Sequence, residues 1–262
     1  MTGGRTVAIV TGAARGGGQG VALALGGHVG ALVLVARSTR DRPNRLLPGT
    51  LEETREHLLP SGTDVACFPA DLARAGDRAA LCGFVGSEYG GCDILVNNAA
   101  YNPVMPFAEL PARRWDTVLE VNLNAAVALS RAMLPAMLAR GHGHIVNIGS
   151  AAAVADFGTQ LAYAVSKAAL ERFTTGLAAE LSGTGIGVNC VRVDEALRTA
   201  ALAALIGDPE LGSRSVTPAE FGAAVRWIVQ RPASFSGHVL TFQRLRELGA
   251  LPSTTPELPD ER

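Results

Sequence analysis

The chain has 262 residues, of which 48% are hydrophobic, and a formal net charge of -1 at pH 7. This length suffices for one sizeable core, so we expect a single dinucleotide-binding and catalytic domain over residues 1–249 and a Pro-rich extension over residues 250–262. The near-neutral charge, with no basic run, argues against nucleic acid or a membrane surface as the main partner and favours a small molecule.

Short β-rich runs alternate with longer helical patterns along the chain. In order, the runs are "TVAIV" (6–10), "ALVLVA" (31–36), "DVACFPA" (64–70), "DILVN" (93–97), "HIVNIG" (144–149), "GVNCVRV" (187–193) and "HVLTF" (238–242). Continuous apolar strands separated by helices are typical of a parallel sheet covered on both faces. The sequence therefore predicts an α/β protein with a single-domain Rossmann fold, a doubly wound parallel sheet of about seven strands.

The first strand leads into "TGAARGGGQG", where Gly12, Gly16 and Gly18 have the spacing GxxxGxG. Glycines at a strand-to-helix junction let the backbone approach a pyrophosphate, and the helix N-terminus supplies N–H groups and a partial positive charge. A plain glycine-rich turn is the alternative, because the chain contains 30 glycines. The position directly after the first strand favours dinucleotide binding.

The end of the second strand bears on the choice of dinucleotide. Enzymes that prefer NAD usually carry an acidic residue there, but this chain has Ala36, followed by Arg37. Arg15, in the glycine turn, is a second cation suited to flank a 2′-phosphate. We predict that NADP(H) is preferred, with NAD(H) as the alternative if both arginines are simply surface residues of an Arg-rich chain.

The following elements carry further signals. Thr50 with Glu53 forms a capping-box pattern, as does Thr217 with Glu220, so each pair predicts a helix start. At the end of the third strand, Asp71 is predicted either to bind the adenine amino group or to cap the next helix. The stretch 115–138 is apolar on more than one side, which indicates burial against the sheet and against something else, a subunit interface being one candidate.

Lys167 is the only lysine in the chain, and every other Lys+Arg position carries arginine. Tyr163 lies four residues before Lys167 in a helical pattern, so both side chains share one helix face. A compact ammonium about 4 Å from a phenol oxygen stabilises the phenolate by about 4 kcal/mol at an effective dielectric of 20. The pair is therefore suited to acid–base chemistry near neutral pH, although a half-buried tyrosine beside a lysine retained by chance is the alternative.

The cysteines form no CxxC pair and have no histidine at zinc-ligand spacing; they are Cys67, Cys82, Cys92 and Cys190. We interpret them as reduced thiols and predict no metal site. The N-terminal apolar run is too short for a signal peptide, and no apolar run approaches about 18 residues. We therefore expect a cytoplasmic location.

Five motifs in this order resemble those of the classical short-chain dehydrogenase/reductase family over nearly the whole chain. They are "TGAARGGG" (11–18), "NNAA" (97–100), "VNLNA" (121–125), "IVNIGS" (145–150) and "YAVSK" (163–167). The 13-residue separation of Ser150 and Tyr163 also matches the family pattern. Each motif alone is weak, but their joint occurrence in order is specific.

The resemblance implies that Tyr163 exchanges a proton with the substrate oxygen while a hydride moves between the substrate carbon and nicotinamide C4. It implies that Lys167 binds the nicotinamide ribose and favours the phenolate, that Ser150 orients the carbonyl oxygen, and that Asn122 holds a water linking Lys167 to solvent. Ordinary structural roles, as a turn serine, a helix-interior asparagine or a packed aromatic, are the alternative for each residue taken singly. The cofactor-binding residues implied by the resemblance also include Asn98, Ala99, Val193 and Thr199.

The segment "VRVDEALRT" (191–199) departs from the family pattern. Val193 and Asp194 stand where the family commonly has Pro-Gly, and Thr199 falls one position later than the expected threonine. We hypothesise that Asp194 or Glu195 lies near the nicotinamide and favours its oxidised form, with a helix-capping role as the alternative. The last strand continues into "FQRLRELG", which resembles the hydroxysteroid dehydrogenase-like branch.

Three loop segments are expected to form the substrate pocket, namely 101–110, 151–158 and 197–213, because they follow the carboxyl ends of strands. Their apolar residues indicate a hydrophobic ketone, aldehyde or alcohol. The main prediction is thus an NADP(H)-dependent oxidoreductase that forms a homodimer or homotetramer. The alternatives are a non-redox enzyme of the same family, such as an epimerase or dehydratase, and a cofactor-binding regulatory or scaffold protein without redox activity.

Overall fold

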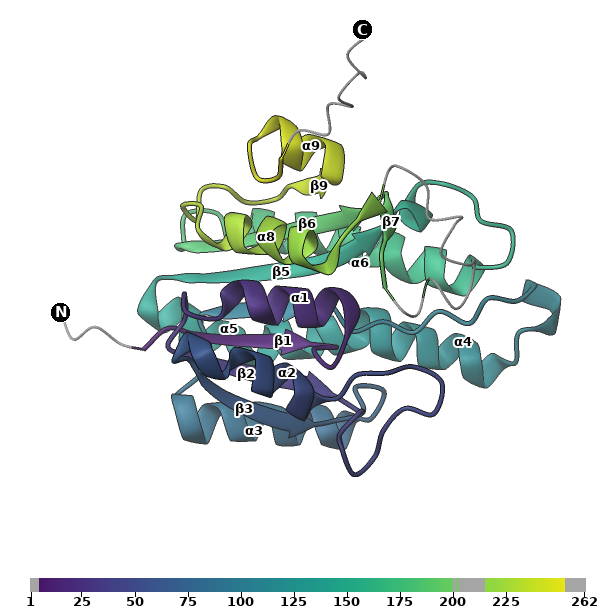
Figure 1. Ribbon diagram of the computed structural model, residues 1–262. Helices are drawn as coiled ribbons and strands as arrows, with labels where there is room; N and C mark the ends of the chain where they lie inside the picture. Colours follow the sequence, from purple (N-terminus) through teal and green to yellow (C-terminus); the bar gives the residue numbers. More distant parts are fainter. Residues whose placement is uncertain (1–4, 200–201, 203–214, 253–262) are drawn as a thin grey trace, which may run out of the picture.

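The computed structural model describes residues 5–199, 202 and 215–252 (Figure 1). Its main sheet has seven parallel strands in the order β3-β2-β1-β4-β5-β6-β9. The strands are β1 (Val7–Thr11), β2 (Ala31–Ala36), β3 (Asp64–Pro69), β4 (Ile94–Asn97), β5 (Gly143–Ser150), β6 (Ile186–Val193) and β9 (Val239–Thr241). All seven predicted strands are present, with ends shifted by at most one residue, so the predicted fold class is confirmed.

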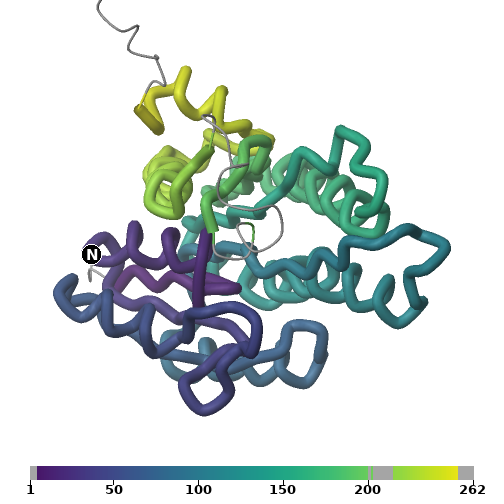
Figure 2. Tube along the Cα trace, turned by 45° about the vertical axis from the view of Figure 1, so that its right-hand side comes forward, coloured from purple at the N-terminus to yellow at the C-terminus, as the bar shows by residue number. Residues whose placement is uncertain are grey.

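Helices cover both faces of the sheet. In front in Figure 1 lie α1 (Gly16–Leu25), α2 (Leu51–Leu58) and α8 (Pro218–Val229); behind lie α3 (Ala75–Tyr89), α5 (Ala125–Arg140) and α6 (Leu161–Glu180). The edge strand β3 and the last described helix, α9 (Phe242–Glu247), lie at opposite ends of the sheet (Figure 2). A small parallel pair, β7 (Ala196–Leu197) with β8 (Ser215–Val216), lies outside the main sheet.

The core consists of two apolar layers, one on each face of the sheet. Successive side chains of a strand point to opposite faces, so Ala8 and Val10 pack in the layer of α1 and α8, whereas Val7 and Ile9 pack in the layer of α3 and α5. Because both faces are buried, the strands are apolar throughout rather than alternating. Because all seven strands are parallel, their carboxyl ends lie at one edge of the sheet.

Both predicted capping boxes are present. Thr50 accepts a hydrogen bond from the backbone N–H of Glu53 at the start of α2, and the Glu53 carboxylate accepts one from the backbone N–H of Thr50. Thr217 and Glu220 do the same at the start of α8. These local bonds satisfy amides that have no partner within the helix, which explains why both starts are readable from sequence.

The predicted apolar stretch 115–138 is not one regular helix. It runs from α4 (Ala112–Leu119) through a π-helical turn, η3 (Glu120–Asn124), into α5. Leu129, Met133 and Met137 pack against the sheet, whereas Leu138 is 44% exposed. The run Ala112–Arg140 is long and apolar enough to cross a membrane by length and composition alone, but several of its apolar residues, such as Leu129 and Met133, pack in the core. A subunit interface on its outer side stays a prediction.

Candidate active site

The predicted site residues converge at the carboxyl edge of the sheet, at the right of Figure 1. The glycine turn follows β1, residues 98–101 follow β4, Ser150 ends β5 and residues 194–199 follow β6. In a doubly wound sheet this edge, at the point where the strand order reverses, is the usual place for a ligand. Here the reversal lies between β1 and β4.

The glycine turn forms a tight cradle. Gly12 and Gly16 have φ values of 70° and 56°, a region that favours glycine. A Cβ on Gly18 would lie 2.2 Å from the carbonyl oxygen of Gly12, so the first turn of α1 lies directly against the end of β1. No described side chain caps α1, and its first turn contains no acidic residue. Its leading amides therefore suit an anion such as a diphosphate.

Arg15 is held at the base of this cradle. Its guanidinium donates hydrogen bonds to the carbonyl oxygens of Pro48 and Gly49, at 2.7 and 2.8 Å, and to the hydroxyl of Ser38 at 2.7 Å. Burial, and secondarily the charge of Arg37, lower the pKa of Arg15, while Glu53 acts in the opposite direction. These acceptors are neutral, so they orient Arg15 without neutralising it, and the positive charge beside Arg37 fits a phosphate group.

Thr11 joins the glycine turn to the residues after β4. Its hydroxyl accepts hydrogen bonds from the backbone N–H groups of Asn98 and Ala99, at 2.9 and 3.0 Å, and the Asn98 amide donates to the Thr11 carbonyl at 2.8 Å. Asp71 accepts a hydrogen bond from the backbone N–H of Ala73 at 3.1 Å. This bond closes the turn before α3 and does not cap the helix, whose N-cap is Arg74 with no side-chain hydrogen bond. The predicted helix-capping alternative is therefore wrong for Asp71, and an adenine contact stays a prediction.

Tyr163 and Lys167 lie on one face of the first two turns of α6. Lys167 is only 2% exposed, and its Nζ donates to the carbonyl oxygen of Ile148 on β5 at 2.6 Å. The same Nζ lies 5.5 Å from the centre of the Tyr163 ring. A buried ammonium is costly without such a partner, so the strand carbonyl fixes the cation beside the tyrosine.

Ser150 ends β5 and starts the short turn η4 (Ala151–Ala153), which packs against α6. Its hydroxyl accepts a hydrogen bond from the backbone N–H of Ala152 at 3.2 Å. Because a hydroxyl has one proton and two lone pairs, this contact leaves the Ser150 O–H group as a donor. The hydroxyl is thus suited to donate to a substrate oxygen.

The side chain of Asn122 is used within the protein. Its Oδ1 accepts from the backbone N–H of Tyr101 at 2.8 Å, and its Nδ2 donates to the Tyr101 carbonyl and to the Ser166 hydroxyl, both at 3.0 Å. Ser166 in turn donates to the carbonyl of Tyr163 at 2.7 Å. Asn122 thus ties the loop after β4 to α6. Our sequence reasoning missed Ser166, although it lies inside the "YAVSK" motif.

The segment that replaces Pro-Gly engages α9. Asp194 accepts a hydrogen bond from the backbone N–H of Phe242 at 2.9 Å, and Glu195 forms two hydrogen bonds with Arg246, at 2.5 and 2.7 Å. Asp194 therefore caps the first backbone N–H of α9, which is the helix-capping role given above as the alternative to a place near the nicotinamide. Further along, a Cβ on Gly16 would lie 3.0 Å from the Thr199 methyl group, so Thr199 lies over the glycine turn.

The predicted substrate loop 101–110 is hydrogen-bonded to the residue that follows the loop 151–158, and both loops present apolar side chains. The backbone N–H of Met105 donates to the carbonyl of Thr159 at 2.8 Å. Val104, Phe107 and Phe157 are between 43% and 62% exposed. The third predicted wall, 197–213, lies outside the described residues from 200 onward, except Leu202.

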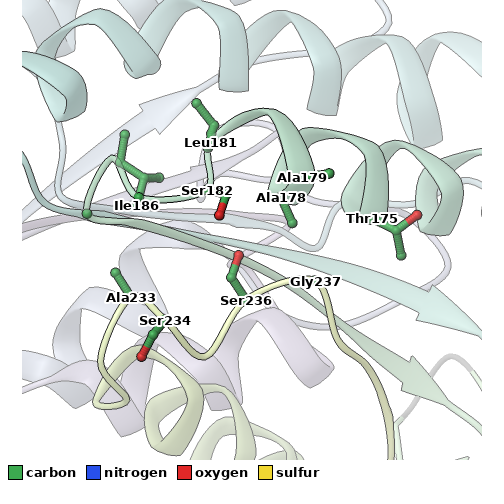
Figure 3. Close-up of a pocket in the computed structure, with 12 residues that line it drawn as sticks. Thr175, Ala178, Ala179, Leu181, Ser182, Ile186, Ala233, Ser234, Ser236 and Gly237 are labelled. Atoms are coloured by element: carbon green, nitrogen blue, oxygen red, sulfur yellow. The ribbon is translucent and has the colours of Figure 1, made fainter.

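A separate cavity of about 550 Å³ lies at the opposite edge of the sheet, between the end of α6, the start of β6 and the loop before β9. Figure 3 shows the hydroxyls of Ser182 and Ser236 facing one another across it. It contains none of the predicted catalytic residues, so it is not the candidate active site.

Comparison with known proteins adds independent information. A family model described as short chain dehydrogenase matches residues 6–204. The 2-(R)-hydroxypropyl-CoM dehydrogenase of Xanthobacter autotrophicus is 38% identical over 192 residues, which are 71% of this chain and 72% of that protein.

Solved structures of similar fold include cofactor complexes. The L-sorbose reductase from Gluconobacter frateurii, complexed with NADPH and L-sorbose, has a TM-score of 0.79 and 29% identity, covering 91% of this chain and 95% of its own. A metagenomic short-chain oxidoreductase in complex with NADP has a TM-score of 0.74 and 29% identity, covering 90% of this chain and 96% of its own. The likeness thus extends over most of the fold.

Proposed function

The chain belongs to the short-chain dehydrogenase/reductase family of oxidoreductases, and on this basis we propose that it interconverts a ketone or aldehyde with an alcohol on an apolar small molecule, with NADP(H) preferred over NAD(H). One observation carries the proposal: Lys167, buried and bonded to the Ile148 carbonyl, lies beside the Tyr163 ring at the carboxyl edge of the sheet. Such a pair is suited to acid–base chemistry on a substrate oxygen.

The residues around the glycine turn fit a nicotinamide dinucleotide. The uncapped start of α1 suits the diphosphate, and Arg15 with Arg37 suits a 2′-phosphate. Asp71, Asn98, Ala99, Lys167, Val193 and Thr199 complete the proposed binding set. Two relatives of similar fold have NADPH or NADP bound. When bound, the cofactor supplies or accepts the hydride.

The side chains of this protein would handle the proton. In the reducing direction, Tyr163 donates its phenolic proton to the substrate oxygen, and in the oxidising direction it accepts the alcohol proton. Lys167 stabilises the phenolate through its charge. The Ser150 O–H group donates a hydrogen bond to the same substrate oxygen. Asn122 positions the loop after β4 against α6 through Tyr101 and Ser166.

The exposed apolar side chains of the loops 101–110 and 151–158 support a substrate with little charge. Val104, Phe107 and Phe157 lie on segments that follow β4 and β5, and such side chains gain free energy when an apolar ligand covers them. Substrates of this kind are hydrophobic ketones, aldehydes and secondary alcohols.

The test is a titration of the purified protein with NADPH and with NADH, followed by nicotinamide fluorescence. We expect tighter binding of NADPH, and NADPH consumption with a panel of apolar ketones and aldehydes. Tyr163→Phe should retain cofactor binding and lose turnover by about 100-fold or more. Binding of neither cofactor would overturn the proposal. Cofactor binding without net turnover on any ketone, aldehyde or alcohol would favour a non-redox or regulatory protein instead.

A further inference from the structure

The segment after β6 is anchored by the last described helix of the chain. Asp194 accepts the backbone N–H of Phe242, the first residue of α9, and Glu195 forms a two-bond ion pair with Arg246, one turn further on. Both side chains of this ion pair are only 14% exposed. Hydrogen-bonded pairs between a guanidinium and a carboxylate have a defined geometry as well as charge, so α9 sets the position of residues 194 and 195.

The core holds α9 itself in place. Phe242 and Leu245 are completely buried, and the Phe242 ring contacts the Phe221 ring of α8 edge to face, with centroids 6.1 Å apart. An anchor on a rigid helix positions its partner more precisely than an anchor on a loop. The helix is therefore a fixed support and not a loose tail.

The far end of the same segment reaches the glycine turn. Ala196 and Leu197 pair with β8, and the Leu197 side chain would be 3.0 Å from a Cβ on Gly17. Thr199 lies equally close to Gly16. Residues 194–199 thus run from α9 to the start of α1. A displacement of Glu195 would shift Leu197 and Thr199, which pack against the glycine turn that suits the diphosphate.

Arg246 also balances negative charge at this edge. Its hydrogen bonds to Glu195 raise its pKa, burial opposes this, and the nearby charges of Glu195, Glu220 and Asp194 raise it further. Arg246 thus offsets part of the negative charge of these three carboxylates. Arg244, on the same helix, pairs with Glu247 at the surface, with both side chains about half exposed.

We propose that Arg246 is a positioning residue for the nicotinamide half of the cofactor: by holding Glu195 it sets the place of residues 194–199, which begin at Asp194, the second of the two positions where the family commonly has Pro-Gly. This inference rests on the proposed function, because it assumes that the dinucleotide binds at the glycine turn. It assigns a role to α9, which lies far along the chain from every catalytic residue.

The experiment compares two ligands on four proteins: the wild type and the variants Arg246→Gln, Arg246→Lys and Arg244→Gln. The ligands are NADPH, followed by fluorescence, and adenosine 2′,5′-bisphosphate, which lacks the nicotinamide half, followed by calorimetry. Arg246→Gln should raise the dissociation constant of NADPH by about tenfold or more, which corresponds to about 1.4 kcal/mol. Arg246→Lys keeps the charge but not the fork and should bind NADPH with intermediate affinity.

Binding of the bisphosphate shows that a variant is folded and that its site for the adenine half of NADPH is intact. Arg246→Gln should weaken the binding of the bisphosphate much less than the binding of NADPH, and Arg244→Gln should bind both ligands as the wild type does. If Arg246→Gln binds NADPH like the wild type, or loses both ligands to the same extent, the positioning role is wrong. A wild type that binds neither ligand contradicts the proposed function itself.

Discussion

At the scale of single residues, Lys167 combines near-complete burial with a hydrogen bond from its Nζ to a strand carbonyl. An ammonium is compact, whereas a guanidinium is planar and carries five donors in a fixed fork. The space between α6 and β5 therefore suits lysine and not arginine. This explains how one lysine can persist in a chain whose other Lys+Arg positions are all arginine.

We predict that Lys167→Arg lowers kcat by about 100-fold or more, because the larger cation cannot occupy the same place beside Tyr163. The measurement is steady-state kinetics with NADPH and an accepted ketone, together with the melting temperature. Arg172→Lys, on the exposed side of α6, is the matched control and should have wild-type activity. Wild-type kcat in Lys167→Arg would show that the ammonium is not required.

The choice between NADP(H) and NAD(H) is also a residue-scale question. Arg37 is exposed and Arg15 is held by neutral acceptors. We predict that Arg37→Gln raises the dissociation constant of NADPH by about tenfold and leaves that of NADH unchanged, since only NADPH carries the 2′-phosphate. Fluorescence titration of both cofactors checks this, with the exposed Arg45→Gln as control. An equal effect on both cofactors would argue against a 2′-phosphate contact.

At the scale of elements, α6 and β6 are joined by a largely buried ion pair. Glu171, one turn after Lys167, bonds Arg192 through two contacts of 2.9 and 2.7 Å, with the side chains 10% and 22% exposed. A Cβ on Gly149 would lie 2.7 Å from the Glu171 carboxylate. Glycine at this place in β5 thus leaves room for the carboxylate to reach β6.

We predict that Glu171→Gln lowers the free energy of unfolding by about 2 kcal/mol. Removing one partner of a fully buried ion pair costs about 3 to 5 kcal/mol, and the effect is smaller here because Arg192 is partly exposed. Chemical denaturation measures this. Glu180→Gln, at the exposed end of the same helix, should change stability by less than about 0.5 kcal/mol. Equal stability of the two variants would mean that the ion pair contributes nothing net.

At the scale of the whole molecule, α5 and α6 present apolar side chains to solvent. Leu138, Leu161 and Val165 are 44%, 49% and 41% exposed, on the helical layer behind the sheet in Figure 1. Contiguous apolar surface marks subunit contacts, and Leu161 and Val165 lie one turn apart on α6. The homodimer or homotetramer stays a prediction, as do the cytoplasmic location and the domain boundary after residue 249; residues 253–262 of the predicted extension lie outside the described part.

We predict a dimer or tetramer at micromolar concentration, and a smaller species for Val165→Asp, because a charge in an apolar contact is unfavourable. Light scattering coupled to size exclusion measures both. Leu23→Asp, at 39% exposure on α1 in the opposite layer, is the control and should keep the wild-type mass. A monomeric wild type would contradict this prediction.

The sequence by itself determined those features that depend on residues close together in the chain. The seven strands, the two capping boxes and the shared helix face of Tyr163 and Lys167 are all written within spans of a few residues, where strand period, helix period and cap chemistry act. The order of family motifs added the fold and the reaction class.

Only the tertiary structure decided which distant groups meet. The Asn122 amide is paired with the backbone of Tyr101, and Arg246 holds Glu195 across 51 residues of chain. Both contacts depend on how the sheet stacks the elements, and no local pattern specifies them. The sequence alone shows that Val193 and Asp194 replace Pro-Gly. That Asp194 contacts α9 follows only from the pairing of β6 with β9, because parallel strands bring the ends of distant segments to one edge.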